Sequence, residues 1–232
     1  MKQNIYPIYY EFRIKNERLK LFKINLDLQT ISLIPVPQHN VPDWCRLNYC
    51  QCECCPLDKS SRLFCPIAVN IAHLVEEFKD MISHQTCIVR CMTPERTYQK
   101  KTTIMEALSS IFGIIMATSN CPIMEFLKPM ARFHLPFATV EEQMVRSLSL
   151  YLLGEYFENK DKSEIHFDTK KFDQHYQKVM ILNKGFISRI KAVAKKDADV
   201  NAIYILHSIS ELLTSEIKFR LNLIEPIFLR GK

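Results

Sequence analysis

The sequence predicts an α+β protein in which a small N-terminal antiparallel sheet packs on a mainly helical C-terminal bundle. Apolar residues alternate with a period of two in the first 36 residues, which is typical of strands. After residue 66 most apolar residues recur with a helical period. The 232 residues include only four glycines, so few positions break a helix. A chain of this length buries a sizeable core without disulfides, and we expect a single domain over residues 1–232.

Residues 1–36 are expected to form a β-meander. Residues 6–14 are aromatic and β-branched, residues 19–26 alternate cleanly, and residues 30–36 have the composition of a third strand. Several prolines then end regular structure. We therefore expect an irregular cysteine-rich loop over residues 37–65.

Residues 66–232 are expected to be mainly helical, with a strand pair near residues 86–101. Two capping boxes, Thr103 with Glu106 and Thr139 with Glu142, mark helix starts. A polar linker is expected over residues 159–168. The periodicity predicts helices over residues 66–83, 104–118, 140–158, 169–195 and 199–223, and a further helix that starts at Cys121-Pro122 and is interrupted near Pro129.

Charge and hydropathy exclude some classes of protein. The net charge is +6, but the basic excess lies at the two ends and forms no dense stripe with aromatic residues, which argues against nucleic-acid binding. The sequence contains no run of 18 apolar residues, so it predicts no membrane span. Residues 1–11 lack the apolar core of a signal peptide, so we expect a cytoplasmic protein, with a protein partner left open.

The cysteines are the most informative residues. Six of the nine lie between Cys45 and Cys65, a density that no ordinary core needs. In a reducing compartment, clustered thiols are typical of metal ligands or redox groups rather than structural disulfides. Cys52 and Cys55 have the spacing of a metal-binding knuckle, and Cys65 follows after nine intervening residues.

A fourth ligand is suggested by the prolines that follow two cysteines. Cys65 and Cys121 each precede a proline that suits the first position of a helix. Each sulfur would then lie at a helix N-terminus, where free N–H groups and the helix dipole stabilise a thiolate. The predicted metal ligands are Cys52, Cys55, Cys65 and Cys121, with Cys54, Cys50, Cys45 and His134 as substitutes.

The ligand type fits zinc and an iron–sulfur cluster equally well. A ligand cysteine before proline is familiar from ferredoxin-type runs, but the spacing matches neither a ferredoxin nor a zinc ribbon. The leading hypothesis is a regulatory or interaction module with structural zinc, because four thiolates that pin a loop need no further chemistry. One alternative is a [4Fe–4S] redox protein or enzyme. The other is a metal-free thiol redox sensor that uses a low-pKa Cys65 or Cys121.

Three polar residues are candidates for catalysis. Arg132 and His134 stand among apolar residues, where both need partners if they are buried. Together with Arg96 they would hold an anionic ligand, with His134 as acid or base. The structural alternative, which we favour, is an arginine that caps carbonyl groups and a satisfied core histidine. The sequence has no Gly-rich phosphate loop, Gly-x-Ser-x-Gly elbow or His-Glu-x-x-His motif, so it leaves open whether the protein is an enzyme.

Five short segments carry a resemblance to a known family. They are CPL (55–57), CPxA (65–68), MTPER (92–96), MATSxCP (116–122) and MARFHLPFAT (130–139). Together they resemble the signature of an uncharacterised bacterial family, a domain of unknown function. The resemblance implies a bacterial origin and one domain that includes both the sheet and the helices, and it implies no activity.

Overall fold

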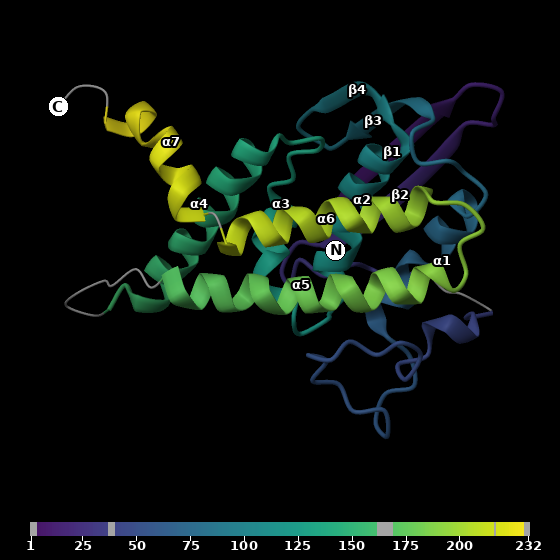
Figure 1. The fold of residues 1–232 in the computed structure, drawn as a ribbon, viewed down its shortest axis with the longest axis horizontal. Coiled ribbons are helices and arrows are strands. Elements are labelled where there is room, and N and C mark those ends of the chain that lie inside the picture. The colour runs from purple at the N-terminus through teal and green to yellow at the C-terminus, as the bar shows by residue number, and fades with distance from the viewer. Residues whose placement is uncertain (1–3, 37–39, 162–168, 216, 230–232) are drawn as a thin grey trace.

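The computed structural model describes residues 4–36, 40–161, 169–215 and 217–229. It confirms the α+β class: one four-stranded antiparallel sheet lies behind a set of helices (Figure 1). The strand order is β2-β1-β3-β4, so the predicted pair near residues 86–101 extends the N-terminal sheet. The strands are β1 (Ile5–Ile14), β2 (Lys20–Asp27), β3 (Thr86–Met92) and β4 (Thr97–Thr103).

Alternation along the strands sets which face of the sheet is buried. In β1, Ile8, Tyr10 and Phe12 are fully buried on one face. Tyr10 pairs with Cys91 of β3. Burial raises the pKa of Cys87 to about 11 and that of Cys91 to about 12, so both thiols behave as small apolar core residues.

The predicted third strand over residues 30–36 is wrong. Leu33 forms only an isolated bridge with Leu26. The Leu33 N–H donates to the carbonyl of Thr118 at 2.8 Å, and Ile31 has a left-handed φ of 50°. The Ile34 N–H donates to the Asn25 carbonyl and the Asp27 N–H to that of Ser32, so the segment pairs with the end of β2 over a single bridge and does not form a full strand.

Seven α-helices and two short 3-10 helices occupy the rest of the described chain. They are η1 (Asp43–Cys45), α1 (Pro66–Phe78), α2 (Ile104–Thr118), η2 (Glu125–Leu127), α3 (Lys128–Arg132), α4 (Val140–Asn159), α5 (Thr169–Lys191), α6 (Ala198–Ser215) and α7 (Ile217–Leu229). Both predicted residues cap their helices: the Thr103 side chain accepts from the Glu106 N–H, and Thr139 forms a reciprocal capping box with Glu142.

Three predicted helices end or begin elsewhere. Helix α1 ends at Phe78 rather than near residue 83, because the Ser83 N–H is held by the Asp197 carboxylate at 2.8 Å. After Cys121 the chain makes a turn and η2 before α3, so no helix starts at Pro122. The single helix expected over 199–223 is divided into α6 and α7. The expected linker over 159–168 lies largely outside the described residues.

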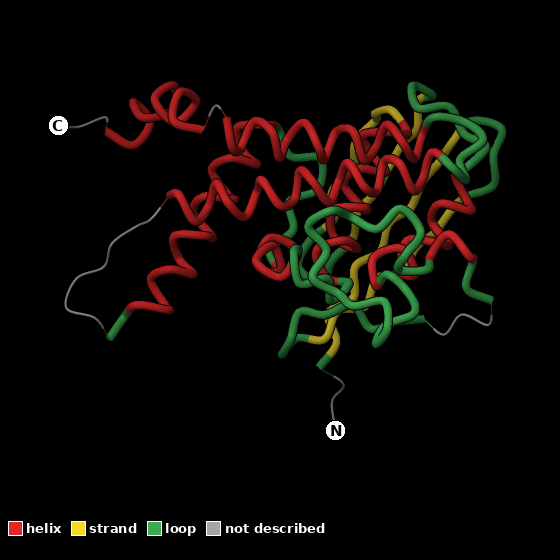
Figure 2. The backbone as a smooth tube through the Cα atoms, turned by 60° about the horizontal axis from the view of Figure 1, so that its bottom comes forward, coloured by secondary structure: helices red, strands yellow, loops and turns green. Residues whose placement is uncertain are grey.

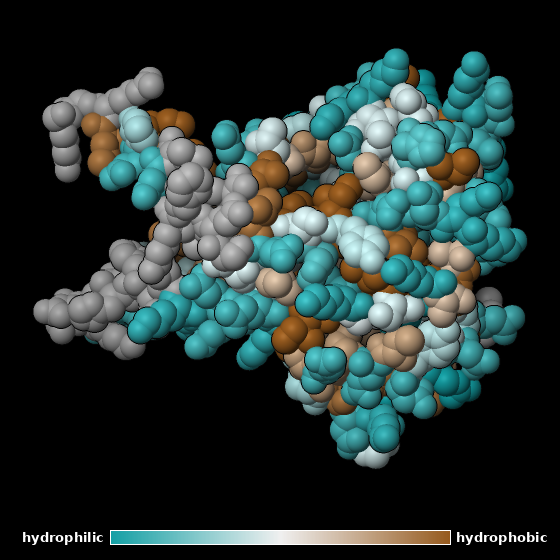
Figure 3. Space-filling view, viewed as in Figure 1, coloured by the Kyte–Doolittle hydropathy of each residue, from teal (hydrophilic) through white to brown (hydrophobic). Residues whose placement is uncertain are grey.

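The helices form two layers over the sheet. Helices α1 and α2 cover its buried face, where Phe78 contacts Phe12 with ring centroids 5.0 Å apart. Helix α6 packs on α2, and α5 runs alongside α6 in both views (Figures 1 and 2). Figure 3 shows mainly polar side chains on this face, with apolar ones gathered across its middle. Nowhere in the described part of the chain does a helix combine the length and apolarity that crossing a bilayer requires.

Candidate metal centre

The cysteine-rich loop forms a lobe that is closed at its base. Arg46 and Phe64 form an isolated bridge, and the Leu47 N–H donates to the Leu63 carbonyl at 2.9 Å. The Cys65 N–H donates to the Cys45 carbonyl at 2.9 Å, which brings the start of α1 against η1. Every predicted ligand except Cys121 therefore belongs to this lobe or to its base.

One face of α5 holds the lobe. The Cys52 Sγ lies 3.7 Å from the Leu182 carbonyl oxygen, and the Cys54 Sγ lies 3.4 Å from that of Lys178. A Cβ atom added to Gly185 would lie 2.9 Å from the Cys52 Sγ. The absence of a side chain at Gly185 is thus what lets α5 approach the lobe so closely.

The four predicted ligands lie on three segments of the chain. Cys52 and Cys55 lie on a tight turn, in which the Cys55 N–H donates to the Cys52 carbonyl at 2.9 Å. Cys65 is the N-cap of α1, and Cys121 follows α2. Burial raises the pKa of Cys52 to about 12 and that of Cys121 to about 12, and the charges of Cys65 and Cys55 raise both further. Cys65 and Cys55 thus influence both Cys52 and Cys121, whereas Cys52 and Cys121 show no direct influence on each other.

Backbone N–H groups face two of these sulfurs. Burial raises the pKa of Cys65, and hydrogen bonds from the backbone of Ala68 and Ile67 act in the opposite direction. At Cys121 the backbone of Ile123 and Met124 has the same effect. Backbone amides therefore lie near both sulfurs, although the Cys65 side chain makes no capping hydrogen bond at the start of α1, and those near Cys121 belong to a turn and not to a helix.

The low pKa that a metal-free sensor requires is not found at either residue. Burial outweighs the backbone hydrogen bonds at Cys65 and Cys121, so each free thiol holds its proton at neutral pH. Metal coordination would change this balance, because a ligand thiol is deprotonated by the metal itself.

The other cysteines have different surroundings. Cys45 is fully buried and donates to the Ala68 carbonyl at 3.4 Å. Cys54 faces Lys178, as described above, and Cys50 is exposed. Among the residues that the structure describes, no three His, Cys, Asp or Glu side chains lie close enough together to hold one metal ion.

Arg189 is the functional residue that sequence reasoning missed. Its side chain is fully buried one helical turn from Gly185, and its guanidinium donates to the carbonyl oxygens of Trp44, Arg46 and Leu47. Within the described residues it forms no ion pair with a carboxylate, and its Nε has no partner. Its positive charge instead lowers the pKa of several lobe thiols, among them Cys52.

A comparison with protein-family models identifies the relatives of this chain. The model described as "Domain of unknown function (DUF6901)" matches residues 8–229. The chain belongs to this family. The match confirms the resemblance to a domain of unknown function, whereas the motif signature and the bacterial origin stay predictions. Neither the curated proteins nor the solved structures include a match to this DUF6901 chain.

Two of the catalytic candidates of this DUF6901 protein, Arg96 and Arg132, lie near the same carboxylate. Arg132 is 4.0 Å from Glu95, and the pKa of Arg96 is raised by its bond to Tyr98 and, less strongly, by the charge of Glu95. Arg96 is exposed and donates to the Tyr98 hydroxyl at 3.4 Å. Arg132 stacks on the Tyr6 ring, with its guanidinium carbon 4.2 Å from the centroid. His134 lies apart from both of these contacts and meets the buried Tyr10. The structure therefore does not join the two arginines and the histidine in one anion site.

His134 lines an internal cavity and is held by the sheet. Its Nε2 lies 2.6 Å from the Tyr10 hydroxyl, which also lies 2.8 Å from the Ser110 Oγ. Burial lowers the pKa of His134 to about 3, and the charge of Arg146 lowers it further, so the ring is neutral at pH 7. The carbonyl-capping arginine is Arg146 rather than Arg132, because Arg146 donates to the carbonyls of Met130 and Phe133 at 3.2 and 2.6 Å.

Proposed function

We propose that this DUF6901 protein binds a thiolate-ligated metal centre, and that the centre is an iron–sulfur cluster in preference to a single zinc ion. The ligands proposed are Cys52, Cys55, Cys65 and Cys121. When bound, such a cluster supplies one-electron transfer at a potential set by its charge, its hydrogen bonds and its burial.

The charge of Arg189 is the observation that carries the proposal. Removing a guanidinium from water is costly unless a negative partner compensates it. Carbonyl groups orient Arg189 but carry no net charge, and no carboxylate of the described residues pairs with it. Thiolates bound to a metal would supply the missing negative charge beside it.

The surroundings of the sulfurs support the same conclusion. Backbone N–H groups point at Cys65 and Cys121, although burial favours the neutral thiol at both positions. Donors at a sulfur are useful when that sulfur is anionic, and hydrogen bonds to ligand sulfurs are a standard means of tuning a cluster. We therefore interpret these N–H groups as part of the centre.

Zinc and an iron–sulfur cluster differ in how far apart they hold their ligand sulfurs. A zinc ion holds each sulfur at about 2.3 Å, so its four ligands crowd around one point. An iron–sulfur cluster lies between its ligands and keeps their sulfurs further apart. No three such side chains of the described residues are close enough to hold one ion, so we propose that a cluster spans the wider gap between the four sulfurs.

The proposal assigns the cluster a structural task as well as a redox capacity. It would join the lobe, the start of α1 and the segment after α2, which otherwise meet through few hydrogen bonds. Because metal binding energy becomes folding energy when the ligands lie on separate segments, loss of the centre should release the lobe.

Single serine substitutions test the ligand assignment. Metal content and melting temperature are measured for Cys65→Ser and Cys121→Ser after purification without oxygen. Both variants should lose most of the metal, and both should melt earlier. Cys50→Ser is the matched control from the same loop, and it should retain the metal. Full metal content in Cys65→Ser and Cys121→Ser, or its loss in Cys50→Ser, would overturn the assignment.

A further inference from the structure

A cavity of about 600 Å³ lies between α2, α4 and α6, and none of the four proposed metal ligands lines it. Most of its lining is apolar and includes four of the chain's nine methionines: Met105, Met116, Met124 and Met130. Methionine is unbranched and polarizable, so walls of this kind adapt to the shape of an apolar ligand. Cavities of this size hold small organic molecules in many proteins.

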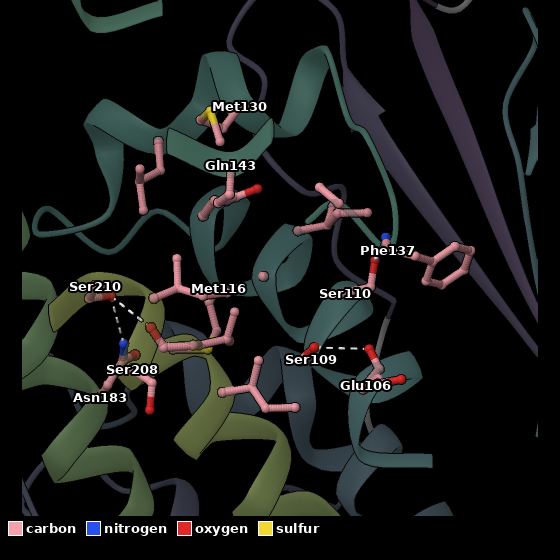
Figure 4. Close-up of a pocket in the computed structure, with 18 of the residues that line it drawn as sticks. Glu106, Ser109, Ser110, Met116, Met130, Phe137, Gln143, Asn183, Ser208 and Ser210 are labelled. Atoms are coloured by element: carbon pink, nitrogen blue, oxygen red, sulfur yellow. Dashed lines mark hydrogen bonds between the residues drawn. The ribbon is translucent and has the colours of Figure 1, made fainter. Parts of the chain in front are cut away.

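Arg146 of α4 brings a positive charge to one end of this cavity. Its guanidinium donates to the carbonyls of Met130 and Phe133 at 3.2 and 2.6 Å and to the Gln143 Oε1 at 3.4 Å. None of these three acceptors carries a net charge. Figure 4 shows Met130 and Gln143 together and well away from Glu106, so Arg146 and Glu106 belong to different ends of the cavity.

The guanidinium of Arg146 keeps N–H groups for a ligand. An arginine side chain has five N–H donors, and the three contacts above engage only Nη1 and Nη2. Its Nε makes no hydrogen bond within the described ranges. In contrast to the Nε of Arg189, this atom is not fully buried. A free N–H with accessible surface therefore belongs to a cation that lines the cavity.

The positive charge of Arg146 has no ion-pair partner in the part of the chain that the structure describes. Glu142 accepts from the Thr139 N–H at 2.7 Å in the capping box of α4, and Glu106 accepts from the Thr102 hydroxyl. Burial lowers the pKa of Arg146, and nearby groups, Glu142 among them, oppose this shift only in part. A cation that is partly withdrawn from water favours a negative partner.

His134 adds a second donor at the same end of the cavity. Burial and the charge of Arg146 lower the pKa of His134 to about 3, so its ring is neutral and lies near the guanidinium. Its Nε2 lies 2.6 Å from the Tyr10 hydroxyl, whereas its Nδ1 has no hydrogen bond to a described residue and is not fully buried. When the Tyr10 hydroxyl donates to Nε2, the ring proton is on Nδ1 and is free to bind an anion.

We propose that this cavity binds an organic anion with one carboxylate and an unbranched apolar chain. The carboxylate would accept from the free N–H of Arg146, and the chain would lie along the methionine walls. A single uncompensated positive charge matches a single negative one. A phosphate group with two charges would need a further cation, and the other one among the described lining residues, Lys100, is exposed. The proposal is independent of the metal centre, since no cysteine lines the cavity.

Octanoate and 1-octanol form a matched pair of probes, because they share a chain length but only octanoate carries a charge. Calorimetric titration of the purified protein at pH 7 should show one saturable site for octanoate and at least about tenfold weaker binding of 1-octanol. From butanoate to octanoate, the affinity should rise about threefold with each added methylene group. Equal affinity for octanoate and 1-octanol, an affinity that does not change with chain length, or no saturable binding of octanoate would overturn the proposal.

Three substitutions locate the carboxylate. Arg146→Gln should abolish the preference for octanoate over 1-octanol, whereas Arg146→Lys, which keeps the charge, should retain part of it. Lys100→Gln removes the exposed cation of the lining and should leave the preference unchanged. Retained preference in a folded Arg146→Gln protein, or its loss in Lys100→Gln, would overturn the assignment. The comparison of probes on the wild-type protein decides the proposal even if Arg146→Gln does not fold.

Discussion

Gly185 of α5 lies directly against Cys52, and a Cβ atom at Gly185 would come within 2.9 Å of the Cys52 Sγ and 3.2 Å of its Cα. Helix α5 is thus in backbone contact with the cysteine lobe. Replacing a glycine inside a helix by alanine normally stabilises a protein by roughly 1 kcal/mol. At Gly185 the close contact should reverse the sign of that effect.

We expect Gly185→Ala to lower the free energy of unfolding by about 1–3 kcal/mol, because the added methyl group overpacks the contact with Cys52. It should also weaken metal retention. Gly154→Ala is the control, since no atom lies within 4 Å of a Cβ added there, and it should raise stability by about 0.5–1 kcal/mol. Chemical denaturation measures both values. A stabilised Gly185→Ala protein would show that the contact is loose.

Arg189→Met should lower the free energy of unfolding by at least about 3 kcal/mol, because it removes the charge that faces the thiols and the donor to three carbonyl groups, of which that of Arg46 keeps the Tyr49 N–H as a second donor. Arg189→Lys keeps the charge but loses the planar fork, so it should retain the metal with reduced stability. Metal content and denaturation midpoint are measured on both. Normal metal content in Arg189→Met would remove the electrostatic basis of the proposed centre.

His134 should make the protein less stable in mild acid. Burial lowers its pKa from 6.5 to about 3, so between these values the unfolded chain binds a proton that the folded one does not. The contribution of the neutral His134 ring to the free energy of unfolding is complete above pH 6.5. It decreases as the pH falls, and the loss reaches up to about 2 kcal/mol at pH 5. Tyr10 and Arg146 are the groups that face it.

The test is the pH dependence of unfolding in wild type and in His134→Gln, which keeps an acceptor for Tyr10. The substitution should reduce the loss of stability between pH 7 and pH 5. Parallel curves for the two proteins would mean that His134 is protonated in the folded state.

Asp199 should have the opposite pH dependence. Its side chain is fully buried in the first turn of α6, neither oxygen has a partner among the described residues, and burial raises its pKa well above the usual value. The folded protein thus holds a proton that the unfolded chain releases as the pH rises past 3.8, which lowers stability at neutral pH.

Asp199→Asn should therefore raise stability at pH 7 by about 1 kcal/mol or more and have a smaller effect at pH 4. Thermal melts at the two pH values measure the difference. A variant that is destabilised equally at both would show that the carboxyl group has a partner when folded.

The sequence predicted those features that depend on nearby residues. The alternation in β1 and β2, the cap at Thr139 and the start of α1 after Cys65 all follow from short patterns. The predicted strand over 30–36 is reduced to a single bridge at Leu33, whose outward N–H donates to Thr118, a partner 85 residues away. Gly185 and Arg189 were missed for a similar reason. Each looks ordinary within its own helix, and their role appears only when residues 44–52 fold against them.

The most direct test of the central claim is the iron, sulfide and zinc content of the wild-type protein purified without oxygen, together with its visible absorption. The account predicts iron and acid-labile sulfide in equal amounts, about four of each per chain, and a broad visible band that Cys65→Ser removes. One zinc ion per chain without sulfide would contradict the cluster, and a metal-free protein that melts at the same temperature as its Cys65→Ser variant would contradict any metal centre at these cysteines.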